Sequence, residues 1–222
     1  MSVHQNFRHL LEAVEANAVT LTELRVDTGG LMRETWSTNE VRTLITTAPS
    51  LSLLEAAIML CHDRQLARAM LRNEPPFQAL RVRRLLFWCF TPGVENAFFS
   101  DLSCHASLED VSLWRLLLGT VAAMGALVDA CIKIRLSKLI LSVCDVVPAV
   151  LPELTRLIAA GAIRELSVYN ANTEMFDEAH ESTRLFVAAV RASPLTKLQL
   201  DNLGGAPANV VEAAAFINAR QQ

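Results

Sequence analysis

The residues best suited to chemistry in this chain are its cysteines, because two of the five stand directly before a histidine. Cys61 precedes His62, and Cys104 precedes His105. A thiolate and an imidazole are zinc ligands, and the same pair can act as a nucleophile and its base. Neighbouring residues on a helix point about 100° apart, so one such pair makes a poor bidentate site. The separation of the two pairs matches no whole number of the repeats described below, and we expect no metal site.

A third cysteine has an acidic neighbour. Cys144 follows a predicted strand and precedes Asp145, which leaves open an enzyme that uses Cys144 or Cys61 as its nucleophile. The odd number of cysteines and the lack of a CxxC pair favour buried free thiols in a reducing compartment. The chain also lacks GxSxG, HExxH and a glycine-rich loop that would cradle a phosphate. We therefore expect a protein that is not an enzyme and needs no cofactor.

A seven-residue phrase recurs along the chain, with apolar residues at its first, fourth and sixth positions. The copies predict strands near 21–27, 51–57, 77–83, 108–114, 136–142, 163–169 and 195–201. Amphipathic segments between the copies predict helices, so each unit of about 28 residues is a strand followed by a crossover helix. Stacked units give an α/β fold with a parallel sheet and an outer layer of helices. We expect one domain over residues 1–222.

Four stretches carry the clearest form of the phrase: LTELRVDTGGL, LEDVSLWRLLL, LSKLILSVCDV and LTKLQLDNLGG. They resemble the leucine-rich repeat pattern LxxLxLxx(N/C)xL, and the period and helices are similar to the ribonuclease-inhibitor-like subclass. The resemblance implies a horseshoe-shaped solenoid of about seven repeats that binds proteins on its concave sheet. Only Cys144 supplies an expected residue type at the ninth position, where the side chain normally satisfies backbone groups of the turn. We therefore expect irregular turns.

The third, fifth and seventh positions of each phrase should project from the concave face, opposite the core leucines. Arginine, tryptophan and tyrosine are enriched among the residues that dominate binding energy at interfaces, and they gather in these columns of the middle repeats. The candidate partner-binding residues are Arg81, Arg83, Trp114, Tyr169, Arg25 and Glu55. Solvated or packing roles for the same side chains remain the alternative.

Charge and hydropathy narrow the class of partner. The net charge of −3 and the pI of about 6.0 argue against a nucleic-acid binder, which usually has a basic face. The uncharged stretch from Leu116 to Val128 is shorter than the about 20 apolar residues of a membrane-spanning helix. Residues 1–19 contain Glu12 and Glu15 and lack the apolar run of a signal peptide, so we expect a cytoplasmic protein. The sequence leaves the oligomeric state open.

These observations favour a non-catalytic module that binds a protein partner on its concave strand face, as an adaptor or as the recognition domain of an effector. Two alternatives stay open. One is the cysteine enzyme. The other is a self-assembling structural protein, because terminal repeats without caps would expose apolar edges that stack end to end.

Overall fold

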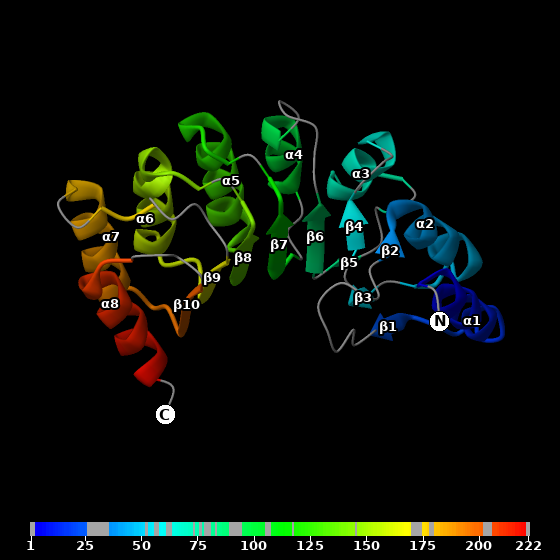
Figure 1. Cartoon of the computed structure of the whole chain (residues 1–222). Coiled ribbons are helices and arrows are strands. Elements are labelled where there is room, and N and C mark those ends of the chain that lie inside the picture. Colours follow the sequence, from blue (N-terminus) through cyan, green and yellow to red (C-terminus); the bar gives the residue numbers. More distant parts are fainter. Residues whose placement is uncertain are drawn as a thin grey trace.

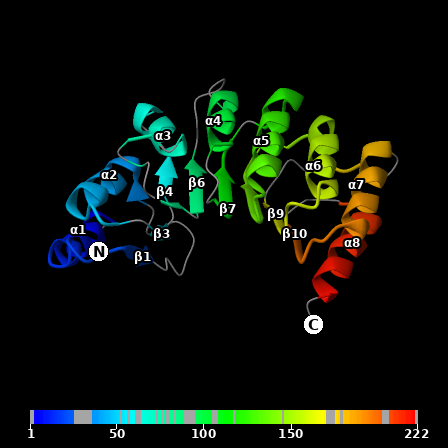
Figure 2. The same ribbon diagram turned by 180° about the vertical axis from the view of Figure 1, so that it is seen from behind.

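The elements of the protein follow one another along an arc, with strands on the inner side and helices on the outer side (Figure 1). The same two layers are seen from behind in Figure 2. The computed structural model describes residues 3–25, 36–51, 53–55, 58–60, 64–72, 74–75, 77, 81–82, 84–88, 95–104, 108–116, 118–144, 146–169, 175–177, 180–201 and 206–220.

Eight α-helices lie within these ranges. They are α1 Val3–Glu15, α2 Thr38–Thr47, α3 Arg64–Leu71, α4 Glu95–Leu102, α5 Val121–Ile134, α6 Leu151–Ala159, α7 Glu181–Ala192 and α8 Ala208–Ala219, and a 3-10 turn, Pro148–Val150, precedes α6. Consecutive helices pack side by side from α1 to α8. Among the described residues, no helix combines the length and the hydropathy that crossing a bilayer requires.

The larger of two sheets has seven parallel strands. They are β2 Trp36–Ser37, β4 Ile58–Leu60, β6 Arg84–Trp88, β7 Asp110–Trp114, β8 Lys138–Ser142, β9 Glu165–Tyr169 and β10 Lys197–Asp201, in the order β10-β9-β8-β7-β6-β4-β2. From β7 to β10 the repeated phrase is aligned position by position, since Val111 pairs with Leu139, Leu139 with Leu166, and Leu166 with Leu198. The four phrases that begin at residues 108, 136, 163 and 195 therefore each contain a strand of this sheet.

The three N-terminal phrases behave differently. They supply β1 Glu23–Arg25, β3 Leu53–Glu55 and β5 Arg81–Val82, which form a separate three-stranded parallel sheet in the order β1-β3-β5. The prediction that these phrases continue the sheet of the later copies is wrong. In the third unit Leu85, and not Leu80, pairs with Val111.

A physical reason for this difference is visible in the sequence. A continuous apolar run buries more apolar surface against the outer helices than a segment interrupted by charged residues. Leu85, Leu86 and Phe87 form such a run in β6, as Ile58, Met59 and Leu60 do in β4. The phrases before them break the run with charged residues, so the later segment takes the place in the larger sheet.

Alternation of buried and partly exposed residues defines the two faces of the central strands. In β7 and β8 the second and fourth residues are buried, while the first, third and fifth are partly exposed. The buried rows face the helices, where Met124 and Leu127 of α5 and Leu154 and Leu157 of α6 are fully buried. The core therefore lies between the sheet and the outer helices, and the opposite face of the strands carries the variable residues.

Helix α5 begins and helix α7 ends at a residue whose side chain completes the backbone hydrogen bonding. The Thr120 hydroxyl accepts a hydrogen bond from the Ala123 N–H (3.2 Å) at the start of α5. The Ser193 hydroxyl donates to the carbonyl of Val190 (2.7 Å) at the end of α7, and Pro194 prevents the helix from continuing. These local signals fix the start of α5 and the end of α7.

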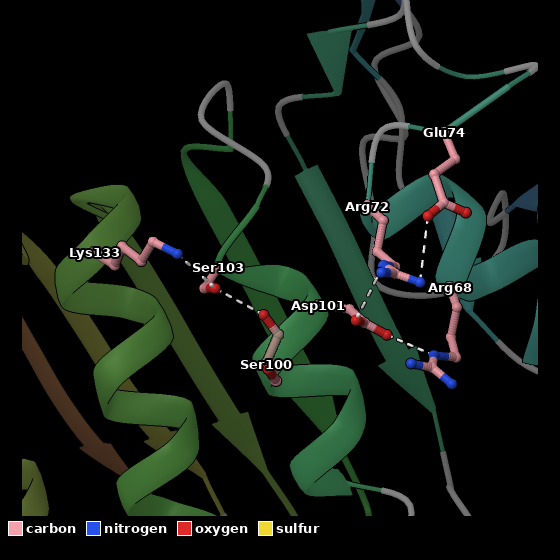
Figure 3. A network of polar contacts seen from close by, with 7 residues as sticks. All are labelled: Arg68, Arg72, Glu74, Ser100, Asp101, Ser103 and Lys133. Atoms are coloured by element: carbon pink, nitrogen blue, oxygen red, sulfur yellow. Dashed lines mark hydrogen bonds and ion pairs between the residues drawn. The ribbon is translucent and has the colours of Figure 1, made fainter.

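A network of charged and polar side chains joins neighbouring helices on the outer side (Figure 3). Asp101 of α4 is only 7% exposed, and its carboxylate accepts hydrogen bonds from Arg68 Nε at 2.6 Å and approaches Arg72 Nε at 3.5 Å. The hydrogen bond that Arg68 donates to the Asp101 carboxylate raises the pKa of Arg68. One helix further on, Lys133 Nζ donates to the Ser103 hydroxyl (3.2 Å). Arg68 and Arg72 lie beside Asp101 because a nearly buried carboxylate needs cationic partners, and these contacts join α4 to α3. The hydrogen bond from Lys133 joins α5 to the end of α4.

The division of β8 into a core face and an open face leads to a test with neighbouring residues. Leu139 is fully buried and Ile140 is partly exposed on the opposite face. We expect Leu139→Ala to lower the free energy of unfolding by about 3 kcal/mol, through lost transfer energy and a residual cavity. Ile140→Ala should cost less than half as much. Urea denaturation measures both, and equal losses would contradict the assignment of faces.

Candidate functional site

Two aromatic residues end two strands of the larger sheet that are separated by one strand, on the face that the helices leave open. Trp114 is the last residue of β7 and Tyr169 the last of β9. The register places Ser142 of β8 between them, paired with Trp114 on one side and Tyr169 on the other. Both aromatic residues are partly exposed. Two strand spacings put them about 10 Å apart, with only a small side chain between.

The residues that follow β7 and β8 have a strained backbone. Arg115 has a φ of 53° and Val143 a φ of 54°, in the left-handed region that costs an L-residue about 1–2 kcal/mol. The hydrogen-bond ladder holds them there, since the Arg115 N–H donates to the carbonyl of Ser142 (3.0 Å) and the Val143 N–H to that of Tyr169 (2.9 Å). Val143 is nevertheless 38% exposed. Strained residues of this kind gather at functional sites.

We name Trp114, Arg115, Ser142, Val143 and Tyr169 the strand-end site. A hydrogen bond fixes its second aromatic residue, because the Tyr169 hydroxyl donates to Gln199 Oε1 of β10 at 2.8 Å. The site thus combines two oriented aromatic rings, one exposed guanidinium and one exposed apolar side chain. This set of groups suits contact with another molecule better than proton or group transfer.

Charged residues at the other end of the strands neutralise one another. Lys138 Nζ lies 3.7 Å from Asp110 Oδ2 and 3.6 Å from Glu165 Oε2 on the adjoining strands. Lys197 pairs in register with Glu165, so the signs alternate from β7 to β10. The open face therefore has a self-neutralised charged row at the N-terminal ends of the strands. Its aromatic residues lie at the C-terminal ends.

The residues between these two rows are uncharged. The third residue of each strand is Ser112, Ile140, Ser167 or Gln199 in order from β7 to β10. Ser167 is only 2% exposed, since the larger Ile140 and Gln199 flank it in register. The centre of the face offers no acid–base pair.

Cys144 does not form an activated thiol. Its Sγ is buried and lies 3.5 Å from the carbonyl oxygens of Leu113 and Ser142, to which it donates. Burial raises the pKa of the Cys144 thiol to about 11, so the thiol stays protonated at neutral pH. The side chain contacts backbone carbonyl groups of β7 and β8, which is a structural role.

The other candidate residues for nucleophilic or metal chemistry give no site. Cys61, His62 and His105 lie outside the described residues. Within the part of the chain that the structure describes, no three or more histidine, cysteine or acidic side chains are placed to hold a metal ion. Cys104 is exposed near the end of α4, and burial raises the pKa of the Cys131 thiol to about 12.

The structure divides the predicted partner-binding residues between two sheets. Trp114 and Tyr169 lie on the larger sheet, on β7 and β9 with β8 between them. Arg25 and Glu55 pair with each other in register on the smaller sheet, and Arg81 belongs to that sheet as well. The structure therefore does not bring Arg81 together with Trp114, and a binding role for these residues stays a prediction. Arg83 lies outside the described residues.

Sequence reasoning missed three residues of this region: Arg115, Val143 and Gln199. Gln199 stands in the fifth column of the phrase, and no feature of the sequence predicts its hydrogen bond with Tyr169. Arg115 and Val143 occupy equivalent positions directly after their phrases, but arginine and valine are not residue types that predict a positive φ. No known family model matches the chain, and no curated protein matches its sequence.

The contrast between the buried and the exposed cysteine gives a direct test. With a pKa of about 11, about one Cys144 thiol in a thousand is ionised at pH 8, and only the thiolate is alkylated. We expect iodoacetamide to modify Cys104 at least about a hundredfold faster than Cys144 in the folded protein. Peptide mass spectrometry measures the rate of alkylation at each cysteine. The rate at Cys144 should rise with pH towards 11. Faster labelling of Cys144 than of Cys104 would support the hypothesis that Cys144 is the nucleophile of an enzyme.

The left-handed conformation of Val143 predicts a stabilising substitution. Asparagine tolerates this conformation and valine does not, so Val143→Asn should raise the free energy of unfolding by about 1 kcal/mol. Val19 is an exposed valine outside the positive-φ set, and Val19→Asn serves as the control with little expected change. Thermal denaturation compares the two. A destabilised Val143→Asn protein would contradict the claim that the left-handed backbone at Val143 lowers the stability of the protein.

Proposed function

We propose that the chain is a leucine-rich repeat solenoid of the ribonuclease-inhibitor-like type, with about seven repeats in one domain. Four observations support this reading: the parallel strands, their aligned register from β7 to β10, the outer helices and the repeated apolar phrase. In the first three units the structural strand is β2, β4 or β6, so the repeat is shifted along the chain there.

Within that fold, the chain acts as a non-catalytic module that binds a protein partner on its open strand face. The observation that carries this proposal is the pair Trp114 and Tyr169, which stay partly exposed on rigid strands with Ser142 between them. Large aromatic side chains fixed on a rigid element lose little entropy on binding and dominate interface energies. A partner of matching chemistry presents an apolar side chain between Trp114 and Tyr169, above Ser142, and an acidic group to Arg115.

The self-neutralised charges at the other end of the strands support a protein as partner. A nucleic-acid surface would need an uncompensated basic row, whereas Lys138 lies between Asp110 and Glu165. We propose a cytoplasmic adaptor or the recognition domain of an effector as its biological setting. The buried, protonated Cys144 weighs against the cysteine-enzyme alternative at that residue.

Removal of the two aromatic rings tests the proposal. The double variant Trp114→Ala, Tyr169→Ala should retain less than about a tenth of the partner captured from native lysate, because such residues contribute about 2 kcal/mol or more each. Leu185→Ala is the matched control, since Leu185 is an exposed apolar residue on outer helix α7. Its capture should be unchanged.

Two further measurements make the result interpretable. The melting temperature of each variant separates lost binding from lost folding. Tyr169→Phe keeps the ring and removes the hydrogen bond to Gln199, so it should retain most of the capture. Full capture by a folded double variant would overturn the proposed site.

A further inference from the structure

The strand β10 ends the seven-stranded sheet, and edge strands normally leave backbone groups open to pairing with another chain. The direction of these groups follows from the ladder. The Lys197 N–H donates to the carbonyl of Arg164 (3.2 Å), which directly precedes β9. Successive residues of a strand direct their N–H and C=O to opposite sides. The backbone groups of Leu198 and Leu200 therefore face away from β9, towards the free edge.

A side-chain amide occupies the edge at Leu198. Asn218 Oδ1 of α8 accepts a hydrogen bond from the Leu198 N–H at 3.1 Å, and Asn218 Nδ2 donates to the Leu198 carbonyl at 2.9 Å. A residue of a neighbouring strand would make the same two bonds. Only one orientation of the amide satisfies both groups, so its assignment is unambiguous.

The position of α8 fits this role. The helix packs against both α7 and β10, and it lies below α7, next to the end of the sheet (Figure 1). Val210, Ala213 and Ile217 form its buried side. Arg220 donates to the carbonyl oxygens of Ser193 and Arg191 at 3.3 Å each. These contacts hold Asn218 against the edge.

The sequence of β10 identifies the strand that this edge would accept. An antiparallel pairing of two β10 strands about a two-fold axis at Gln199 places Leu198 opposite Leu200. These are the two residues whose backbone groups face the edge. The same register pairs Lys197 with Asp201, which carry opposite charges. The strand is thus complementary to a second copy of itself, as a two-fold interface requires.

We propose that the β10 edge is a self-association surface for a second copy of this chain, and that Asn218 keeps it closed by taking the place of the incoming strand. With α8 docked, the edge is occupied and the sheet ends at β10. Displacement of α8 together with its Asn218 amide frees the backbone N–H and C=O of Leu198 and allows two sheets to join through their β10 strands. The inference is independent of the strand-end site and of the partner that binds there.

Two variants of Asn218 test the proposal. Asn218→Leu removes both hydrogen bonds at similar volume, and Asn218→Asp keeps only the acceptor. We expect hydrogen exchange at the Leu198 amide to accelerate about tenfold or more in Asn218→Leu when it is dilute and monomeric. Sedimentation should reveal a dimer of this variant at high concentration. Glu212→Gln, an exposed position on the same helix, is the control that should remain monomeric.

Charge reversal then identifies the interface. Adding Lys197→Asp to Asn218→Leu should abolish the dimer, because two acidic residues would face each other. Adding Asp201→Lys as well should restore it. Monomeric Asn218→Leu protein at both concentrations, or a dimer insensitive to Lys197→Asp, would overturn the proposal. If Asn218→Leu fails to fold, sedimentation of Asn218→Asp decides the matter, because this variant loses the donor to the Leu198 carbonyl and places a carboxylate oxygen against it. A monomer of Asn218→Asp at high concentration would then contradict the role of the amide.

Discussion

The alignment of parallel strands β7 to β10 is the constraint on which the rest of the structure depends. Val111, Leu139, Leu166 and Leu198 form one row of the ladder, and each is buried against the helices. A slip of one residue would turn this row to the open face and bury the polar row beside it. The register that satisfies the core therefore also decides which residues reach a partner, and it places Trp114 and Tyr169 on either side of Ser142.

The same ladder explains how strain is tolerated beside the aromatic residues. Arg115 and Val143 keep their left-handed conformation because their N–H groups are bound to the carbonyl oxygens of the next strand. The turn that follows each strand is thus pre-formed, and little ordering remains to be lost when a partner binds. Cys144 contributes to this rigidity, since its buried thiol donates to carbonyl oxygens of β7 and β8.

The sequence predicts the C-terminal part of this fold well and the N-terminal part less well. Between residues 108 and 201 each unit has one apolar segment that could form the strand, so the repeat period alone predicts where the strands lie. Before residue 90, two candidates compete in each unit, and the more apolar Arg84–Trp88 takes the place that the pattern assigns to 77–83. The column of the phrase predicts the positions of Trp114 and Tyr169 at the ends of their strands, while their binding role stays a prediction. The conformation of Val143, the bond from Tyr169 to Gln199 and the contact of Asn218 with Leu198 depend on tertiary packing, which no local pattern encodes.

Hydrogen exchange on the complex with a captured partner locates the binding surface most directly, because it requires no substitution in the chain. If partners bind at the strand-end site, amides around Arg115 and Val143 should exchange more slowly in the complex, while those of outer helices α4 to α6 stay unchanged. Slower exchange confined to the outer helices, with no change at the ends of β7 and β8, would contradict the proposed binding face.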